Sequence, residues 1–148
     1  MASPFLIQAQ ALTDAGGRRA AFTLAARKAA QGGASAYVYQ WDWRTPAYDG
    51  KFGAVHGIDV SASFHNVRDA FLAGSTSGKR MADRLASTWA AFVRTGDPNN
   101  AHVPLWKPYD DGGRAVMVFN VETRQELNPR SEIRAFWDAH PPAPGPRG

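Results

Sequence analysis

The stretch that decides the fold is residues 34–43, which read Ala-Ser-Ala-Tyr-Val-Tyr-Gln-Trp-Asp-Trp. Aromatic and β-branched residues concentrate here, which favours a β-strand, and the large aromatic side chains alternate along it. They are Tyr37, Tyr39, Trp41 and Trp43, and with a period of two they fall on one face of the strand. Apolar strand edges are usually paired or covered, so we expect this strand to lie between neighbours.

Helices are predicted before and after this strand. A first helix is expected over residues 14–31, because Asp14 is a candidate N-cap and an Ala/Leu/Phe/Arg-rich run ends at Gly32-Gly33. After the strand, the Pro- and Gly-containing residues 44–50 indicate a loop. A short helix is expected from about Asp59.

The longest predicted helix follows a break at Gly74-Ser75-Thr76-Ser77-Gly78, with Ser77 as its N-cap, and stops at Gly96-Asp97-Pro98. Residues 114–119 predict a second strand, and residues 129–139 a short helix. The apolar stripe of the longest helix consists of Met81, Leu85, Ala86, Trp89, Phe92 and Val93.

Two main strands and three to four helices place the chain in the α/β class. A length of 148 residues suits one domain, to which residues 1–140 are assigned. The Pro- and Gly-rich tail, residues 141–148, is expected to be disordered. Two strands are too few to build the sheet that this much aromatic strand surface requires, so the sheet is expected to be incomplete.

Charge and composition argue against several classes of function. The net charge is +4, but the basic residues are scattered among acidic ones, so no nucleic-acid partner is expected. No apolar run is long enough to predict a membrane span. The absence of cysteine excludes disulfides and thiolate chemistry. The cellular compartment stays open, because residues 1–7 lack a signal-peptide pattern but an upstream leader would not be visible here.

The residues that carry chemistry begin about a dozen positions after the strand, with Gly53-Ala54-Val55-His56-Gly57-Ile58-Asp59-Val60. This segment resembles the Gly-x-x-His-Gly-x-Glu/Asp motif of the type-B carboxylesterases, the family that includes cholinesterases and para-nitrobenzyl esterases. Residues 37–46, 89–99 and 105–109 resemble the same family in the same order. Lys107 departs from its Trp-Pro-x-Tyr pattern. The resemblance covers roughly residues 13 to 138.

The resemblance implies the C-terminal portion of an α/β-hydrolase fold and an enzyme that hydrolyses small-molecule carboxylic esters. It implies that His56 is the catalytic histidine, which takes the proton of a serine hydroxyl and later protonates the departing alkoxide. A loop after the carboxyl end of a strand suits this role, because it lets an imidazole project into a site at the edge of the sheet. A single loop histidine more often has a structural role, but the ordered motifs favour catalysis here.

Asp59 matches the acidic position of the motif, which implies a supporting role near the site. It is not expected to be the triad acid, because that acid precedes the histidine in the family's chain order. A carboxylate stabilised by a helix N-terminus explains Asp59 equally well. His65, His102 and His140 are expected to be structural or solvated. His56, His65 and His102 have neither the spacing nor the carboxylate companions of a zinc site, so no metal or other cofactor is expected.

A serine elbow of the form Gly-x-Ser-x-Gly is absent from the sequence. Residues 74–78 come close, but Thr76 occupies the nucleophile position and the segment follows the histidine. No His-Gly-Gly oxyanion segment occurs either. We therefore expect a hydrolase fragment, inactive alone, whose partner is the missing N-terminal part of the same fold. The alternative is a non-catalytic remnant or interaction module that binds a partner through the exposed sheet edge.

Overall fold

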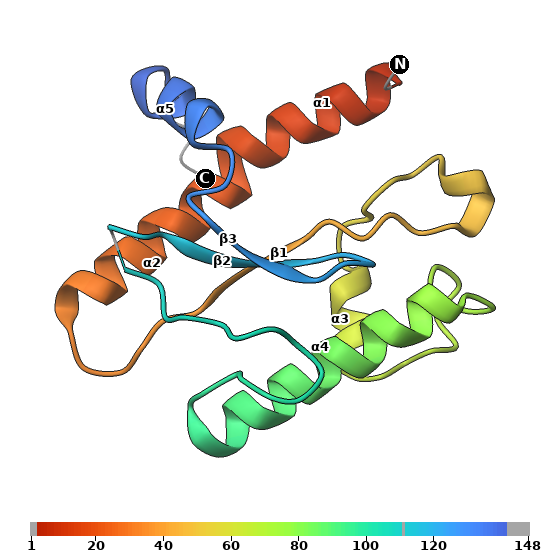
Figure 1. Cartoon of the computed structure of the whole chain (residues 1–148). Helices are drawn as coiled ribbons and strands as arrows, with labels where there is room; N and C mark the ends of the chain where they lie inside the picture. The colour runs from red at the N-terminus through yellow and green to blue at the C-terminus, as the bar shows by residue number, and fades with distance from the viewer. Residues whose placement is uncertain (1–2, 111, 142–148) are drawn as a thin grey trace, which may run out of the picture.

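A three-stranded sheet lies at the centre of the computed structural model, which describes residues 3–110 and 112–141 (Figure 1). The strands lie in the order β1 (Val38–Trp41), β2 (Ala115–Phe119) and β3 (Arg124–Leu127). β2 is parallel to β1 and antiparallel to β3. The α/β class is confirmed. The sheet has one strand more than the two predicted, and β1 is shorter than residues 34–43.

Five α-helices occur in the described part of the chain, rather than three or four. The predicted helix over residues 14–31 starts much earlier, because Ser3 accepts a hydrogen bond from the Leu6 amide and Pro4 occupies the first turn. Asp14 is therefore not an N-cap. The helices are α1 (Pro4–Thr13), α2 (Arg19–Gln31), α3 (Ile58–Ser63), α4 (Thr76–Thr95) and α5 (Ser131–Ala139), and one π-helical turn, Asp14–Arg18, joins α1 to α2.

The helices cover the two faces of the sheet (Figure 1). On one face, α3 and α4 bury Ile58, Met81 and Leu85 against Met117 and Phe119. The aromatic side chains Tyr37, Tyr39 and Trp41 pack on this core, which confirms that they share one face. On the other face, α2 buries Phe22 and Ala25 against Val116.

Helix α4 begins as the sequence suggests but with a different cap. Ser75, not Ser77, accepts the hydrogen bond from the Gly78 amide at 3.1 Å. At Gly78 an added Cβ would lie 2.5 Å from the carbonyl oxygen of Leu72, so only glycine lets this turn approach the preceding segment. The helix ends at Gly96 in the left-handed conformation.

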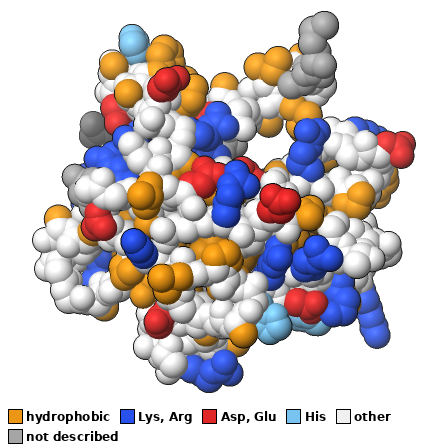
Figure 2. Space-filling view, viewed as in Figure 1, with side chains coloured by type: hydrophobic (Ala, Val, Ile, Leu, Met, Phe, Trp, Pro, Cys, Tyr) orange, Lys and Arg blue, Asp and Glu red, His pale blue; other side chains and the backbone are white. Residues whose placement is uncertain are grey.

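Helix α1 extends from the body as an arm, and Figure 2 shows hydrophobic side chains along it. None of its residues is buried, and Phe5, Ile7 and Leu12 are all exposed. In the described part of the chain, no helix is both long and apolar enough to cross a membrane. The tail predicted to be disordered lies outside the described residues, except for Pro141.

Candidate active site

The loop that carries His56 leaves the carboxyl end of β1 and is anchored in the core. Trp43 and Thr45 are each only 1% exposed. The Thr45 hydroxyl donates to the carbonyl of Phe71 at 2.6 Å and accepts from the amide of Ala47 at 3.1 Å. The Thr45 amide donates to the carbonyl of Gly53 at 3.2 Å, which closes the loop just before the histidine motif.

His56 stands between this loop and α3. Gly57 follows it with φ 86°, a left-handed conformation that glycine adopts without steric cost, and turns the chain into the helix. Ile58, which is 3% exposed, fixes the start of α3 in the core. The His56 imidazole is exposed, and it makes no hydrogen bond to any other described residue. The structure therefore places His56 on an exposed part of the loop between β1 and α3.

Asp59 is held by a side chain from the sheet. Its carboxylate accepts a hydrogen bond from the hydroxyl of Tyr39, in β1, at 2.9 Å. Burial raises the pKa of the Tyr39 hydroxyl above its usual value, and the hydrogen bond to the Asp59 carboxylate, together with its negative charge, raises it further. Tyr39 therefore stays neutral and remains a hydrogen-bond donor. This contact ties the first turn of α3, three residues after His56, to the strand from which the loop departs.

The structure therefore brings Asp59 to Tyr39, and no hydrogen bond among the described residues joins Asp59 to His56. The sequence places Tyr39 on an apolar face, which is correct for its ring but gives no sign of a partner for its hydroxyl. Leu6 of α1 also approaches this loop, because a Cβ built on Gly53 would lie 3.3 Å from its Cδ2.

The other histidines have different surroundings. His65 lies in the turn after α3 with φ 54°. Its Nε2 lies 2.7 Å from the Asp83 carboxylate, to which the ammonium of Lys79 donates at 2.8 Å. The hydrogen bonds from His65 and Lys79, in that order, lower the pKa of Asp83. This is an exposed ion cluster without a nucleophile.

His102 is exposed, and the His140 ring stacks on Phe136 at a centroid distance of 4.7 Å. Among the described residues, no group of three or more potential metal ligands comes together.

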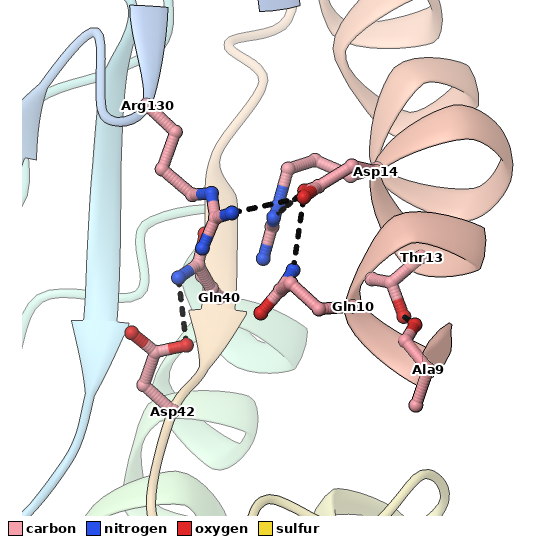
Figure 3. Close-up of polar contacts among 8 residues, drawn as sticks. Ala9, Gln10, Thr13, Asp14, Gln40, Asp42 and Arg130 are labelled. Carbon is pink, nitrogen blue, oxygen red and sulfur yellow. Dashed lines mark hydrogen bonds and ion pairs between the residues drawn. The ribbon is translucent and has the colours of Figure 1, made fainter. Parts of the chain in front are cut away.

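A buried carboxylate outside the histidine loop has a structural role. Asp14 is 6% exposed and binds Arg130 at 2.9 Å, Gln10 at 3.1 Å and Arg18 (Figure 3). Arg130 comes from the turn before α5, so the cluster ties the α1–α2 junction to the C-terminal helix. Its charge is fully paired, and no nucleophile accompanies it, so Asp14 is a structural clamp rather than a second catalytic group.

Comparisons with known proteins identify the family of the chain. The model of the carboxylesterase family matches residues 9–137. Phenmedipham hydrolase from Pseudarthrobacter oxydans is 35% identical over 91 residues, which are 57% of this chain and 18% of that protein. Acetylcholinesterase from Gallus gallus is 29% identical over 76% of this chain and 15% of that protein.

Solved structures of a carboxylesterase and an esterase are also similar to this chain. A crystal structure of carboxylesterase EST55 from Geobacillus stearothermophilus has a TM-score of 0.65 and 33% identity, over 76% of this chain and 24% of that one. An esterase from Clostridium hathewayi has a TM-score of 0.67 and 25% identity, over 75% and 22% of the two chains. The chain thus spans less than a quarter of each of these relatives.

Proposed function

Because this chain belongs to the carboxylesterase family, we propose that it is the C-terminal segment of a carboxylic ester hydrolase and that His56 is the histidine of the catalytic triad. The observation that carries the proposal is the presentation of His56. His56 is exposed on the loop that follows β1, and this loop is anchored through Thr45 and Gly53. In an open α/β sheet, the carboxyl ends of the strands are where ligands bind.

In the proposed reaction, His56 takes the proton of a serine hydroxyl as its oxygen attacks the ester carbonyl. The C–O bond to the alcohol then breaks, and the imidazolium gives its proton to the departing alkoxide. Water repeats the sequence: His56 removes its proton as the hydroxide attacks the acyl-enzyme, and returns that proton to the serine. The histidine thus carries a proton in both directions and is unchanged at the end.

The nucleophile, the triad acid and the oxyanion hole are assigned to the rest of the hydrolase, which precedes this segment. Such parts act as a unit, and loss of the serine or the histidine removes most of the rate. The chain alone is therefore expected not to hydrolyse esters with saturable kinetics.

Asp59 and Tyr39 are assigned a positioning role. Their 2.9 Å hydrogen bond fixes the start of α3, and with it the Gly57 turn that orients His56. Neither group needs to touch the substrate for this role.

The proposal can be tested in a chimera in which this chain replaces the matching segment of the Geobacillus stearothermophilus carboxylesterase. We expect the chimera to hydrolyse para-nitrophenyl acetate. The substitution His56→Ala should lower kcat by about 10⁴ to 10⁶, whereas His65→Ala should leave it within about threefold.

Both variants should melt at the temperature of the parent chimera, which separates lost chemistry from lost structure. A folded His56→Ala chimera that keeps its activity would refute the assignment, as would saturable, His56-dependent hydrolysis by the isolated chain.

A further inference from the structure

A hollow lined by arginine side chains lies between α2 and α5, on the face of the sheet opposite α3 and α4. It has a volume of about 120 Å³. Two buried rings, Phe22 and Tyr109, form its apolar part, with centroids 6.2 Å apart. Its charged side chains are Arg19 from α2, Arg114 from the residue before β2, and Arg134 and Asp138 from α5. Positive groups therefore outnumber negative ones in this hollow.

The guanidinium of Arg19 has no close acceptor. Its Nε lies 3.6 Å from Oδ1 of Asp138, which is too long for a hydrogen bond. This Nε is buried and has no hydrogen-bond partner among the described residues. Buried donors without an acceptor are uncommon in folded proteins and cost free energy. The side chain of Arg19 is nevertheless 37% exposed, so its guanidinium keeps unused donors at the hollow.

Arg134 has only a neutral partner. Its guanidinium donates to the side-chain carbonyl of Asn128. Arg130, one turn earlier, instead pairs with the Asp14 carboxylate at 2.9 Å (Figure 3). In the described part of the chain, neither Arg19 nor Arg134 has a carboxylate within hydrogen-bond distance. The two arginines of the hollow thus carry charge that the protein itself does not closely match.

Helix α5 is held to the rest of the chain by few contacts. None of its residues is buried, and Ile133 and Phe136 are exposed. Arg19 belongs to α2 and Arg134 to α5, so a ligand that binds both arginines connects the two helices.

We propose that this hollow binds a phosphate group, with Arg19 and Arg134 as its main ligands, and that binding clamps α5 onto α2. Each guanidinium presents parallel N–H donors that match two oxygens of an oxyanion. A tetrahedral phosphate has enough oxygens to accept such a pair from both arginines at once, whereas a carboxylate has only two. Arg114 adds positive charge to the same hollow.

Calorimetric titration of the full 148-residue chain with inorganic phosphate tests the site, with sodium chloride keeping the ionic strength constant. We expect one phosphate per chain. Arg19→Gln and Arg134→Gln should each weaken binding by at least about tenfold, because each removes charged hydrogen-bond donors. Arg27→Gln is the matched control. Arg27 is an exposed residue of α2 that does not line the hollow, so the loss of its charge should change the affinity by less than about twofold.

Asp138→Asn gives a change that misfolding cannot mimic. The Asp138 carboxylate repels the ligand and competes with it for Arg19, so the substitution should tighten phosphate binding by at least about threefold. Acetate should bind at least about tenfold more weakly than phosphate. Tighter binding of glycerol 3-phosphate than of inorganic phosphate would support a phosphate ester as the ligand, and the reverse order would support the free ion.

Hydrogen exchange tests the clamp. At a phosphate concentration of ten times Kd, the amides of α5 should exchange more slowly by up to about tenfold, and those of α3 at an unchanged rate. Equal affinities of the parent, Arg19→Gln and Arg134→Gln would overturn the proposal. A response to phosphate that sodium chloride reproduces at equal ionic strength would also overturn it, as would unchanged exchange in α5.

Discussion

Tyr39 ties the first turn of α3, just after His56, to the strand β1. Among the described residues, its hydroxyl is the only hydrogen-bond donor to the half-buried Asp59 carboxylate. We predict that Tyr39→Phe lowers the free energy of unfolding by about 1–3 kcal/mol, because it removes that donor and leaves the carboxylate unsatisfied. Urea denaturation measures the change, and Tyr48→Phe is a control at an exposed ring. A neutral Tyr39→Phe would contradict the anchoring role.

Tyr39 also makes stability depend on pH in the alkaline range. Its pKa is raised in the folded chain above the usual value of 10.0, so folding favours the neutral phenol. This contribution is complete below about pH 10 and is lost as the pH rises from there towards the higher folded pKa. The free energy of unfolding should therefore fall above about pH 10, and Tyr39→Phe should reduce the slope. An unchanged slope in the variant would assign the effect to other groups.

The sequence predicts the individual residues of the site only in part. His56 and Asp59 could be located because their spacing belongs to a recognisable motif. The Tyr39 partner could not, because the period of the strand reports where a ring lies but not what its hydroxyl reaches. The partner is twenty residues away, and only the fold brings it near.

The first turn of α4 offers a prediction about capping. Ser75 accepts a hydrogen bond from the Gly78 amide, whereas Ser77 only contacts the Ser75 hydroxyl. Ser75→Ala should cost about 1 kcal/mol of stability and Ser77→Ala clearly less. Chemical denaturation of the two variants decides between the caps. The reverse order would support Ser77, the cap that the sequence favours.

Gly78 and Gly16 differ in how closely other atoms approach them. Gly78→Ala would force a Cβ to within 2.5 Å of the Leu72 carbonyl oxygen, and we predict a loss of about 1–3 kcal/mol. At Gly16, in the turn between α1 and α2, no atom lies within 4 Å of an added Cβ. Gly16→Ala should therefore be neutral or stabilising, by up to about 1 kcal/mol. Equal losses at both sites would mean that the close approach at Gly78 is not rigid.

The elements missed by the sequence have identifiable physical causes. β3 reads Arg-Gln-Glu-Leu, without the β-branched or aromatic residues that mark a strand, because it lies at a solvated edge. The residues Ser3-Pro4 are a start signal for α1. The sequence nevertheless predicts a helix that starts at residue 14, with Gly16 and Gly17 weakening its first turn. The π-helical turn carries the helix through these glycines, and the Asp14 ion pairs stabilise it.

As a whole molecule, the chain exposes apolar surface in several places. Among the described residues, no strand pairs with the outer edge of β1. Trp89 and Phe92 of α4 are exposed, as are Phe5, Ile7 and Leu12 of α1. We predict that the isolated chain is marginally stable or self-associating. Calorimetry and sedimentation at several concentrations measure this. A sharp, cooperative melt of a monodisperse monomer would contradict it.

The rate at which a fluorophosphonate labels the catalytic serine tests the role of His56 most directly, because labelling requires the serine hydroxyl to lose its proton to the histidine. In the chimera with the Geobacillus stearothermophilus enzyme, we predict that His56→Ala slows labelling by at least about 10³, while His65→Ala leaves the rate unchanged. Equal labelling of the parent and the folded His56→Ala chimera would show that another group activates the serine.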